Sequence, residues 1–448
     1  MSDKVIHTVT GRNGSATAVD EVDLTSASVS TSDAGKSATA SSHVTLQQGL
    51  QALSAFMVFM NTWGLLLAFG AFQTYYQQSL LTYKSSSEIA WISTTSGFLI
   101  LFSGVVTGPL FDHGYHRQLL LCGSLLQVFG LMMTSLSKEY YQVFLSQGVC
   151  VGLGGAMLYV PSIAACVMSF DAKTRPKVIG IVSSGTGVGG VIYPIMFRQL
   201  QVRIGFPWTV RAIAFVILGT YFFSYLILPY PPPKVPMVRR MVDRSVFTDW
   251  PFLSAMLGGG FGGCAYYMPS LFLPLFAVTS TKITADLAFY LIAIVNGVSV
   301  IGRLGAGVLA TKIGPLETCA LGVATSALLL FCWISVASVG GIIVWSVFWA
   351  LTSSVIVAMP SAIVPVLSPS MNLIGTRTGM YWAAVGVGIL VGGPIGGALV
   401  NVHARQINWW HLQVFAGLVE AAAAMFCIYP IMHVRRRSKT EEIPTTRV

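Results

Sequence analysis

The chain has 448 residues, of which 54% are hydrophobic and only 9% are charged, and its formal net charge is +10. Soluble domains carry about 25% charged residues, so this composition excludes a protein that folds in water and predicts one embedded in lipid. The basic residues lie in short loops and tails between apolar runs, which favours the charge bias of membrane-protein loops over a nucleic-acid-binding surface.

The first segment, residues 1–49, is rich in Ser, Thr and Ala and has no apolar core. We therefore expect a disordered cytoplasmic tail and no cleavable signal peptide. Twelve apolar segments follow, each close to the ~20 residues that cross a bilayer as a helix. Their expected limits are residues 50–76, 89–111, 118–137, 140–169, 177–200, 208–228, 250–277, 286–310, 315–338, 341–367, 377–401 and 410–432. The pattern predicts an all-α membrane protein with twelve transmembrane helices.

A central linker, residues 229–249, begins with a Pro-rich run and ends with a basic cluster. It divides the chain into an N-terminal six-helix half at 50–228 and a C-terminal six-helix half at 250–432, followed by a basic tail at 433–448. Counted over alternating loops, one side of the membrane receives fourteen Lys and Arg and the other receives six. By the positive-inside rule, both termini are expected in the cytoplasm.

The two halves share a weak internal repeat in which matching residues are separated by 199 positions. The matched pairs are Gly64 with Gly263, Gly108 with Gly307, Asp112 with Thr311, Pro161-Ser162 with Pro360-Ser361, Gly180 with Gly379, Gly187 with Gly386, and Gly189 with Gly388. Most of these residues are Gly or Pro, which set backbone geometry. The repeat therefore predicts a duplicated bundle, and in an apolar chain it indicates a transporter with its substrate site between the halves.

Two sets of residues are candidates for the conformational change. Gly187 and Gly386 lie in Gly-rich helices, where small residues permit close packing and sliding. Asp112 and Arg117 lie at the cytoplasmic end of the second helix, where an Asp can accept from helix N-termini and pair with an Arg. We expect a polar latch that biases which face is closed; the alternative is a solvated loop.

Arg303 lies well inside the eighth apolar segment, where a buried cation costs at least about 2.5 kcal/mol. Its repeat partner is Gly104, so duplication does not account for it. A cation facing a central cavity predicts an anion site, most naturally for a carboxylate. The alternative is an internal ion pair or structural bonds to carbonyl groups. Asn296 and Ser299 precede Arg303 on the same helix and are further candidates for binding substrate.

Other polar residues within the apolar segments have two readings each. Asn61, Gln73, Tyr75 and Tyr76 of the first helix are candidates either for lining the cavity or for bonding neighbouring helices. Glu420, the one acid near the middle of the last helix, is a candidate proton carrier or a structural residue.

The cysteines show no paired spacing and lie within apolar segments, so neither a metal site nor a disulfide is expected, and no cofactor. They are Cys122, Cys150, Cys166, Cys264, Cys319, Cys332 and Cys427.

The run Trp63-Gly64-x-x-x-Ala-Phe-Gly70-x-Phe-Gln73-x-Tyr-Tyr resembles the first helix of fungal monocarboxylate-transporter-like proteins of the major facilitator superfamily. The similarity extends over roughly residues 50–432. Its further motifs are Gly108-Pro-Leu-Phe-Asp-His-Gly-Tyr, Tyr159-Val-Pro161-Ser162, Gly180 through Gly190, Gly205-Phe-Pro-Trp-Thr-Val-Arg211, Asn296-Gly-x-Ser-x-x-Gly-Arg303 and the Gly-Pro-Ile-Gly-Gly run at 393–397.

This resemblance implies the major facilitator fold and a central substrate site. Arg303 matches the helix-8 Arg that binds the substrate carboxylate in animal members. The Lys of helix 1 and the acid one turn before the Arg in those members correspond here to Ala71 and Ser299. The chain thus departs from the pattern of lactate-type proton symport but keeps the anion-binding Arg.

We therefore expect a secondary transporter in the plasma membrane that moves a small organic carboxylate or related metabolite by alternating access, with a proton as the candidate co-substrate. Its expected partners are that substrate and the lipid bilayer, not nucleic acid. The alternatives are a transporter-like nutrient sensor, an exporter of a neutral metabolite, and a membrane enzyme. Tails of about 49 and 16 residues are short for a signalling extension. An enzyme is not expected, because no nucleophile–base cluster or phosphate loop is present in the sequence.

Overall fold

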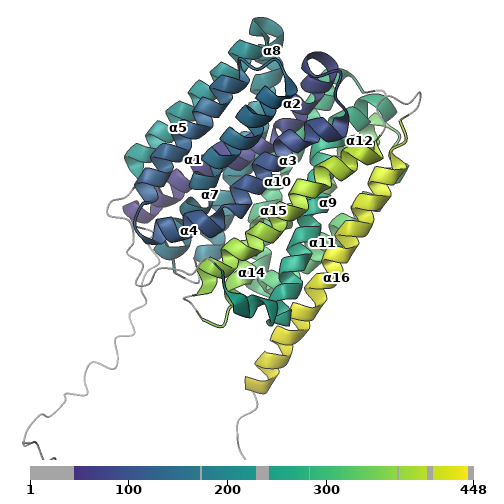
Figure 1. Cartoon of the computed structure of the whole chain (residues 1–448). Helices are drawn as coiled ribbons and strands as arrows, with labels where there is room; N and C mark the ends of the chain where they lie inside the picture. Colours follow the sequence, from purple (N-terminus) through teal and green to yellow (C-terminus); the bar gives the residue numbers. More distant parts are fainter. Residues whose placement is uncertain are drawn as a thin grey trace, which may run out of the picture. The chain divides into compact units, whose positions relative to one another are not determined.

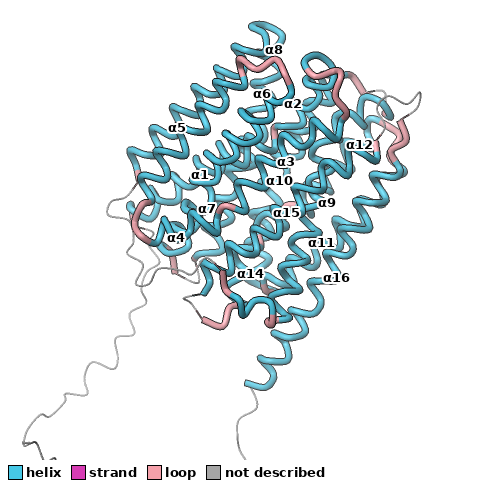
Figure 2. The backbone as a smooth tube through the Cα atoms, viewed as in Figure 1, coloured by secondary structure: helices cyan, strands magenta, loops and turns pink. Residues whose placement is uncertain are grey.

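The structure is a computed structural model that describes residues 45–171, 174–228, 242–281, 283–370, 373–400 and 407–441. In these residues the regular secondary structure is helical, and the connections between helices are short (Figures 1 and 2). Most of the tail expected at 1–49, part of the linker and the last residues of the C-terminal tail lie outside the described residues. The last helix continues to Glu441, which lies within the segment expected as the basic tail at 433–448.

The helices of the first half follow the expected segments closely. Their bounds are α1 Leu46–Leu67, α2 Phe69–Tyr75, η1 Tyr76–Leu80, α3 Ser86–Phe102, α4 Gly104–Asp112, α5 His116–Thr134, α6 Tyr140–Val143, η2 Phe144–Cys150, α7 Val151–Ser169 and α8 Arg175–Ile227. Side chains fix several of the starts. Thr45 and Gln48 form a capping box at the start of α1, and Ser85 and Glu88 form one at the start of α3.

The second half begins with a short η3 turn in the linker. Its elements are η3 Arg244–Phe247, α9 Trp250–Ser280, α10 Ala285–Ile313, α11 Pro315–Cys332, η4 Trp333–Ser335, α12 Val339–Ser353, α13 Val355–Ala358, α14 Pro360–Leu367, α15 Ile374–Leu399 and α16 Trp410–Glu441. Gly314 has φ 98° and ends α10, and Pro315 directly afterwards starts α11. This Gly–Pro pair follows the usual stop and start signals of helices.

Eleven helices of the described residues are long and apolar enough to cross a bilayer, and the longest, Lys177–Ile227, holds two crossings. Its chain turns back at Gly205, which has φ 76°. The reversal is shown by Asn61 of α1, which accepts from the Tyr193 hydroxyl at 2.5 Å and donates to the Thr220 hydroxyl at 2.7 Å. In a straight helix those two residues would stand about 40 Å apart. The twelve expected crossings are therefore present.

Glycines that the repeat relates lie at contacts between equivalent pairs of helices in the two halves. A methyl group added at Gly64 would lie 2.8 Å from the Cα of Gly189, so α1 and α8 touch through two glycines. In the second half, the equivalent helices also touch at glycines: Gly388 of α15 packs on the Gly260 carbonyl of α9, and Gly263, the repeat partner of Gly64, packs on the Val385 carbonyl of α15. Between the halves, α8 packs on α10 and α3 packs on α15, and the α3–α15 pair lies side by side in Figure 1. These cross-half helix pairs enclose the centre of the bundle.

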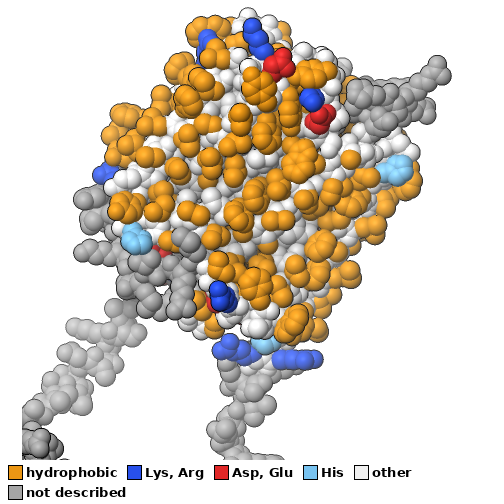
Figure 3. Space-filling view, viewed as in Figure 1, with side chains coloured by type: hydrophobic (Ala, Val, Ile, Leu, Met, Phe, Trp, Pro, Cys, Tyr) orange, Lys and Arg blue, Asp and Glu red, His pale blue; other side chains and the backbone are white. Residues whose placement is uncertain are grey.

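The outside of the bundle is apolar over its middle, and the charged side chains seen on this face lie near its two ends (Figure 3). Large hydrophobic residues are exposed on helices of both halves, among them Phe129, Phe222, Leu328, Phe348 and Met425. Such a surface is unfavourable in water and suits contact with lipid.

Candidate functional site between the halves

Arg303 of α10 is fully buried, with 0% of its surface exposed. Its Nη1 donates to the carbonyl oxygen of Ser183 at 3.2 Å and to the hydroxyl of Thr186, both on α8. Apart from an interaction with the Tyr266 hydroxyl, its Nε and Nη2 have no hydrogen-bond partner, and none of the described carboxylates forms an ion pair with it. Because a guanidinium stays protonated in proteins, a charged group without an anionic partner among the described residues lies between the halves.

One tyrosine from each half interacts with this guanidinium, and two tryptophans lie beside one of these tyrosines. Tyr159 of α7 and Tyr266 of α9 interact with it electrostatically. The Tyr159 ring lies 5.8 Å from the ring of Trp63 on α1 and 6.1 Å from that of Trp382 on α15, between centroids. We call Arg303, Trp63, Tyr159, Tyr266 and Trp382 the central cluster.

The central cluster contains more unused donors than Arg303 alone. The indole Nε1 atoms of Trp63 and Trp382 are buried without a hydrogen-bond partner. Buried donors are normally paired, because an unpaired one costs about 1–3 kcal/mol. The arrangement therefore suits a ligand that supplies several acceptor oxygens and an aromatic or apolar body.

The four aromatic residues of the central cluster were missed as site residues by the sequence analysis. Tyr159 stands in the repeated motif Tyr159-Val-Pro161-Ser162, and Trp382 stands in a Gly-rich helix. In the sequence, the Pro and Gly residues beside Tyr159 and Trp382 form the recognisable motifs, so the aromatic residues themselves do not stand out. The signal available in the sequence was a large aromatic side chain within a run of small ones.

Asn296 and Ser299 lie beside Arg303 on α10, and both of their side chains are satisfied. The Asn296 amide donates to the carbonyl of Gly190 on α8 at 3.0 Å, and the Ser299 hydroxyl donates to the carbonyl of Asn296 at 2.7 Å. Asn296 and Arg303 thus both bind the backbone of α8. As their spacing predicts, the two residues share one face of α10, and this face lies against α8 of the other half.

Gly187 provides the close approach that this contact needs. A methyl group added there would lie 2.5 Å from Val300 Cγ2, 2.8 Å from the Asn296 carbonyl oxygen and 3.3 Å from Arg303 Nη1. Its repeat partner Gly386 faces α3, where the added methyl would lie 3.2 Å from Leu101 Cβ. Both glycines therefore lie where helices of the two halves touch, and the space for a side chain is smaller at Gly187 than at Gly386.

Asn61 belongs to a polar network inside the first half. Besides Tyr193 and Thr220, it contacts Gln127 of α5, whose amide donates to the Asn61 carbonyl at 2.8 Å. Gln127 in turn accepts from the Tyr221 hydroxyl at 2.7 Å. The structure thus places Asn61 among helix-to-helix bonds and not in the central cluster.

Gln73, Tyr75 and Tyr76 also bond to their own half. The Gln73 amide donates to the carbonyl of Ser86 at 3.2 Å, and the Tyr76 hydroxyl donates to Gln147 at 2.5 Å. The Tyr75 ring stacks on Phe206, with centroids 4.8 Å apart. The structure does not bring these side chains into the central cluster.

Asp112 and Arg117 lie on either side of the turn between α4 and α5. Asp112 is buried, with 8% of its surface exposed. Arg117 donates to the carbonyl of Tyr225 at 3.4 Å, and its guanidinium lies 5.0 Å from that ring. Arg117 therefore connects α5 to the end of α8.

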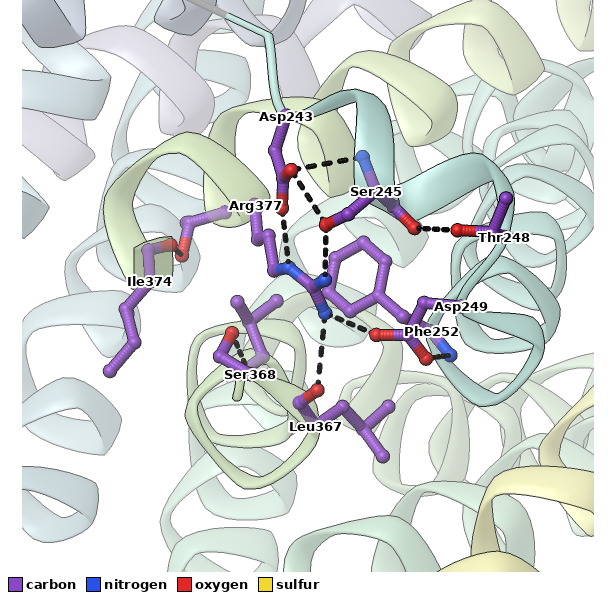
Figure 4. A network of polar contacts seen from close by, with 11 residues as sticks. Asp243, Ser245, Thr248, Asp249, Phe252, Leu367, Ser368, Ile374 and Arg377 are labelled. Atoms are coloured by element: carbon purple, nitrogen blue, oxygen red, sulfur yellow. Dashed lines mark hydrogen bonds and ion pairs between the residues drawn. The ribbon is translucent and has the colours of Figure 1, made fainter. Parts of the chain in front are cut away.

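Arg377, at the start of α15, is the centre of a polar network that the sequence analysis missed (Figure 4). Only 1% of its side chain is exposed, and it forms ion pairs with Asp243 of the linker at 2.9 Å and with Asp249 at 2.5 Å. It also donates to the Ser245 hydroxyl at 3.1 Å, and its guanidinium lies 4.8 Å from the Phe252 ring. The network, here called the linker anchor, ties η3 and the start of α9 to α15.

One of the two acids in the linker anchor, Asp243, has a shifted pKa. Burial alone would raise the pKa of the Asp243 carboxyl, but hydrogen bonds from Ser245 and Arg377 together outweigh burial and hold it below its ordinary value. In the sequence, Arg377 is only one of several basic residues near helix ends. The available signal was the pair of acids, Asp243 and Asp249, at the end of an otherwise basic linker.

Glu420 of α16 is fully buried in the second half, with 0% of its surface exposed. It faces α9 and α11 and is not part of the central cluster.

Comparison with known proteins agrees with this architecture. The sequence profile of the Major Facilitator Superfamily matches residues 52–374. The MFS-type transporter dbaD of Emericella nidulans is 36% identical over 380 residues, covering 85% of each chain. The Aspyridones efflux protein apdF of the same species is 36% identical over 370 residues, covering 82% of this chain and 74% of its own. The Fujikurins efflux protein of Gibberella fujikuroi is 36% identical over 378 residues, covering 82% and 80%.

A solved structure shares the fold. It is a bacterial homologue of the human lysosomal transporter Spinster, crystallised in an inward-facing, unoccupied conformation. It superposes with a TM-score of 0.65 at 14% sequence identity and covers 89% of this chain and 99% of its own. Together with the matched profile and the relatives, this shows that the chain is a multi-pass membrane transporter that belongs to the Major Facilitator Superfamily.

Proposed function

We propose that this transporter exports a small acidic metabolite of secondary metabolism by alternating access, with the central cluster as its substrate site. The direction is supported by two relatives that are efflux proteins for the aspyridones and the fujikurins. We further propose that it works in the plasma membrane with both termini in the cytoplasm, as the loop charges predict.

The observation that carries the proposal is the fully buried Arg303 guanidinium, which has no anionic partner among the described residues and whose Nε and Nη2 have at most the Tyr266 hydroxyl beside them. A carboxylate or enolate oxygen pair would accept from Nε and Nη2 together and neutralise the charge. The buried indole donors of Trp63 and Trp382 would bind further oxygens, and the rings would cover an apolar body. A site of this kind has more aromatic surface than lactate would fill.

A neutral metabolite is the second candidate. It is favoured by the bonds from Arg303 Nη1 to Ser183 and Thr186, which give the guanidinium a structural role between α8 and α10. In that case the remaining donors would bind neutral carbonyl oxygens, and the charge of the substrate would not matter.

The experiment compares matched probes in proteoliposomes. Radiolabelled 4-hydroxybenzoate, 4-hydroxybenzamide and lactate are tested for exchange across vesicles containing the purified protein, with empty liposomes giving the passive leak. We expect exchange of 4-hydroxybenzoate to exceed that of the amide and of lactate at least tenfold, because an anion paired with Arg303 gains about 1.4 kcal/mol or more. Equal exchange of the acid and the amide would show that the substrate is not recognised as an anion.

Variants of one helix then locate the site. Arg303→Ala should abolish exchange, and Arg303→Lys should weaken it at least tenfold although the charge is kept, because the two-donor fork is lost. Ser299→Ala is the matched control on the same helix, since its hydroxyl bonds only the helix backbone. Normal exchange by Arg303→Ala protein would place the site elsewhere.

We also propose that Asp112 and Arg117 bias the closure of the cytoplasmic face. Asp112→Ala should change the accessibility of reporter cysteines on the two faces while binding at the central cluster is kept. Unchanged accessibility would support the solvated-loop alternative.

A further inference from the structure

A second buried ionisable group lies in the C-terminal half, away from the central cluster. Glu420 of α16 is 0% exposed, Ser326 of α11 is its one hydrogen-bonding neighbour, and none of the described cations forms an ion pair with it. An ionised carboxylate with a single hydroxyl and no cation beside it in an apolar interior is very unfavourable, and such a group takes up a proton instead. In the conformation described here, Glu420 is therefore a neutral carboxylic acid.

The groups that interact with Glu420 include one hydrogen-bonding hydroxyl, that of Ser326, but no positive charge that would neutralise a carboxylate. They are Ser326 and Cys319 from α11, Cys264 from α9, and Cys427 from α16 itself. None is a cation. By contrast, Asp243 and Asp249 of the linker anchor are both paired with Arg377. The fold thus pairs its linker acids with a cation and leaves the membrane-embedded acid without one.

We propose that Glu420 is the binding site for a proton that this transporter exchanges for its substrate. The proposal rests on the export function proposed above, because export against a gradient needs an ion that moves in the opposite direction. The chemistry is a simple transfer. The proton leaves the carboxylic acid for a water molecule and a carboxylate remains, which is possible only in a conformation that brings water or donors to Glu420.

The surroundings offer a place for that water. Cys319 and Cys427 line a cavity of about 20 Å³ together with Tyr381, which is room for about one water molecule. Cys427 lies seven residues after Glu420 on α16, so the two share one face about 10 Å apart. Cys319 lies seven residues before Ser326 on α11, which gives the facing helix the same spacing. A separation of α11 from α16 would extend this cavity to Glu420.

α9 connects Glu420 to the central cluster. Cys264, which interacts with Glu420, is two residues from Tyr266, which interacts with Arg303. α15, which carries Trp382, packs tightly on the same stretch of α9: a methyl group added at Gly392 would lie 2.5 Å from the Cys264 carbonyl oxygen. A change of charge at Glu420 would therefore act on helices that hold the substrate site.

The test separates proton coupling from transport itself. Proteoliposomes containing equal radiolabelled 4-hydroxybenzoate on both sides receive an imposed pH difference, with the membrane potential clamped by valinomycin and potassium. Exchange for a proton concentrates the probe in the acidic lumen, up to about tenfold per pH unit. Passive permeation of an acid loads the alkaline lumen instead, so leak cannot imitate the result.

The decisive variant is Glu420→Gln, which keeps the shape and loses the titration. We expect normal exchange at equal pH but an accumulation ratio of one under the pH difference. Glu420→Asp should keep part of the accumulation. Glu317→Gln is the matched control, because Glu317 lies in the same half and pairs at the surface with Arg435. Accumulation by Glu420→Gln equal to that of wild type overturns the proposal, as does wild-type exchange that ignores the pH difference.

A second measurement needs no substrate. Dicyclohexylcarbodiimide modifies protonated carboxyl groups in apolar surroundings, and mass spectrometry of the wild-type protein should find it on the peptide with Glu420 at mildly acidic pH and much less at alkaline pH. If none of the probes is exchanged, the anion-export proposal fails. The labelling still tests the proton site in that case, because it needs no transported substrate. Absence of label on Glu420 at acidic pH overturns the proton site independently.

Discussion

The guanidinium of Arg377 lies 2.5 Å from the carboxylate of Asp249, although 128 residues separate the two in the chain. This ion pair joins the start of α15 to the start of α9 at the end of the bundle where the linker enters. The same guanidinium holds Asp243, so the last part of the linker is fixed to the C-terminal half.

The linker anchor should contribute measurably to stability. Arg377→Ala leaves two carboxylates without their cation and should lower the free energy of unfolding by about 2–3 kcal/mol. The measurement is thermal unfolding of the purified protein together with hydrogen exchange of residues 242–249. Arg435→Ala is the control, because Arg435 is 66% exposed in its pair with Glu317 and such pairs contribute little. Equal effects of the two variants would contradict the buried anchor.

The anchor should also have a defined pH dependence. Because the pKa of Asp243 lies below its ordinary value of 3.8, its contribution to stability is complete above pH 3.8. The contribution is lost as the pH falls through the lowered folded value. We expect Asp243→Asn to unfold at lower temperature than wild type at neutral pH and the two midpoints to converge in strong acid. Parallel midpoints over the whole range would exclude Asp243 as the cause.

Gly187 and Gly386, which lie at contacts between the two halves, should differ in their tolerance of larger side chains. At Gly187 even Gly187→Ala should reduce transport, because its added methyl would press on Val300 and the Asn296 carbonyl. Gly386→Ala should be tolerated and Gly386→Leu should not, since the first contact there is at 3.2 Å. Exchange rates, corrected for the amount of folded protein, decide this order. Gly219→Leu is the control, because an added side chain there meets nothing within 4 Å.

Asn61 should behave as a structural residue. Asn61→Leu removes bonds to Tyr193 and Thr220 that hold both limbs of α8 on α1, and it should lower the unfolding temperature. Probe affinity of the folded fraction should stay within about twofold of wild type. A large loss of affinity at unchanged stability would instead return Asn61 to the substrate site.

Sequence patterns predicted the fold well because bilayer thickness fixes the length of each crossing. Apolar segments, charged gaps and the repeat placed twelve crossings whose limits agree with the helices within a few residues, except that α16 continues nine residues beyond the expected limit of 432, to Glu441. The reversal at Gly205 shows the remaining difficulty. Only Gly205 departs from helical geometry there. The reversal of the chain therefore depends on one residue and leaves almost no trace in the amino-acid composition.

The candidate site was only partly accessible to sequence reasoning. Arg303 stood out because a cation in an apolar run is rare, and the structure places it between the halves. Tyr159 and Trp382 did not, since aromatic residues are common in apolar helices. Their contact across the two halves, next to the buried Arg303 with which Tyr159 interacts, is visible only in three dimensions. Arg377 was hidden for the opposite reason: basic residues are common near helix ends, and its acidic partners come from 128 and 134 residues away.

The polar interiors of the two halves suggest how such a protein diversifies. In the first half, Asn61, Gln127, Tyr193 and Tyr221 satisfy one another. In the second, Arg303 and Glu420 have no comparable set of mutual partners. The central cluster takes Trp63 and Tyr159 from one half and Arg303 and Trp382 from the other. A change in the shape of the bound molecule would therefore require coordinated substitutions in both copies of the repeat, and not in one half alone.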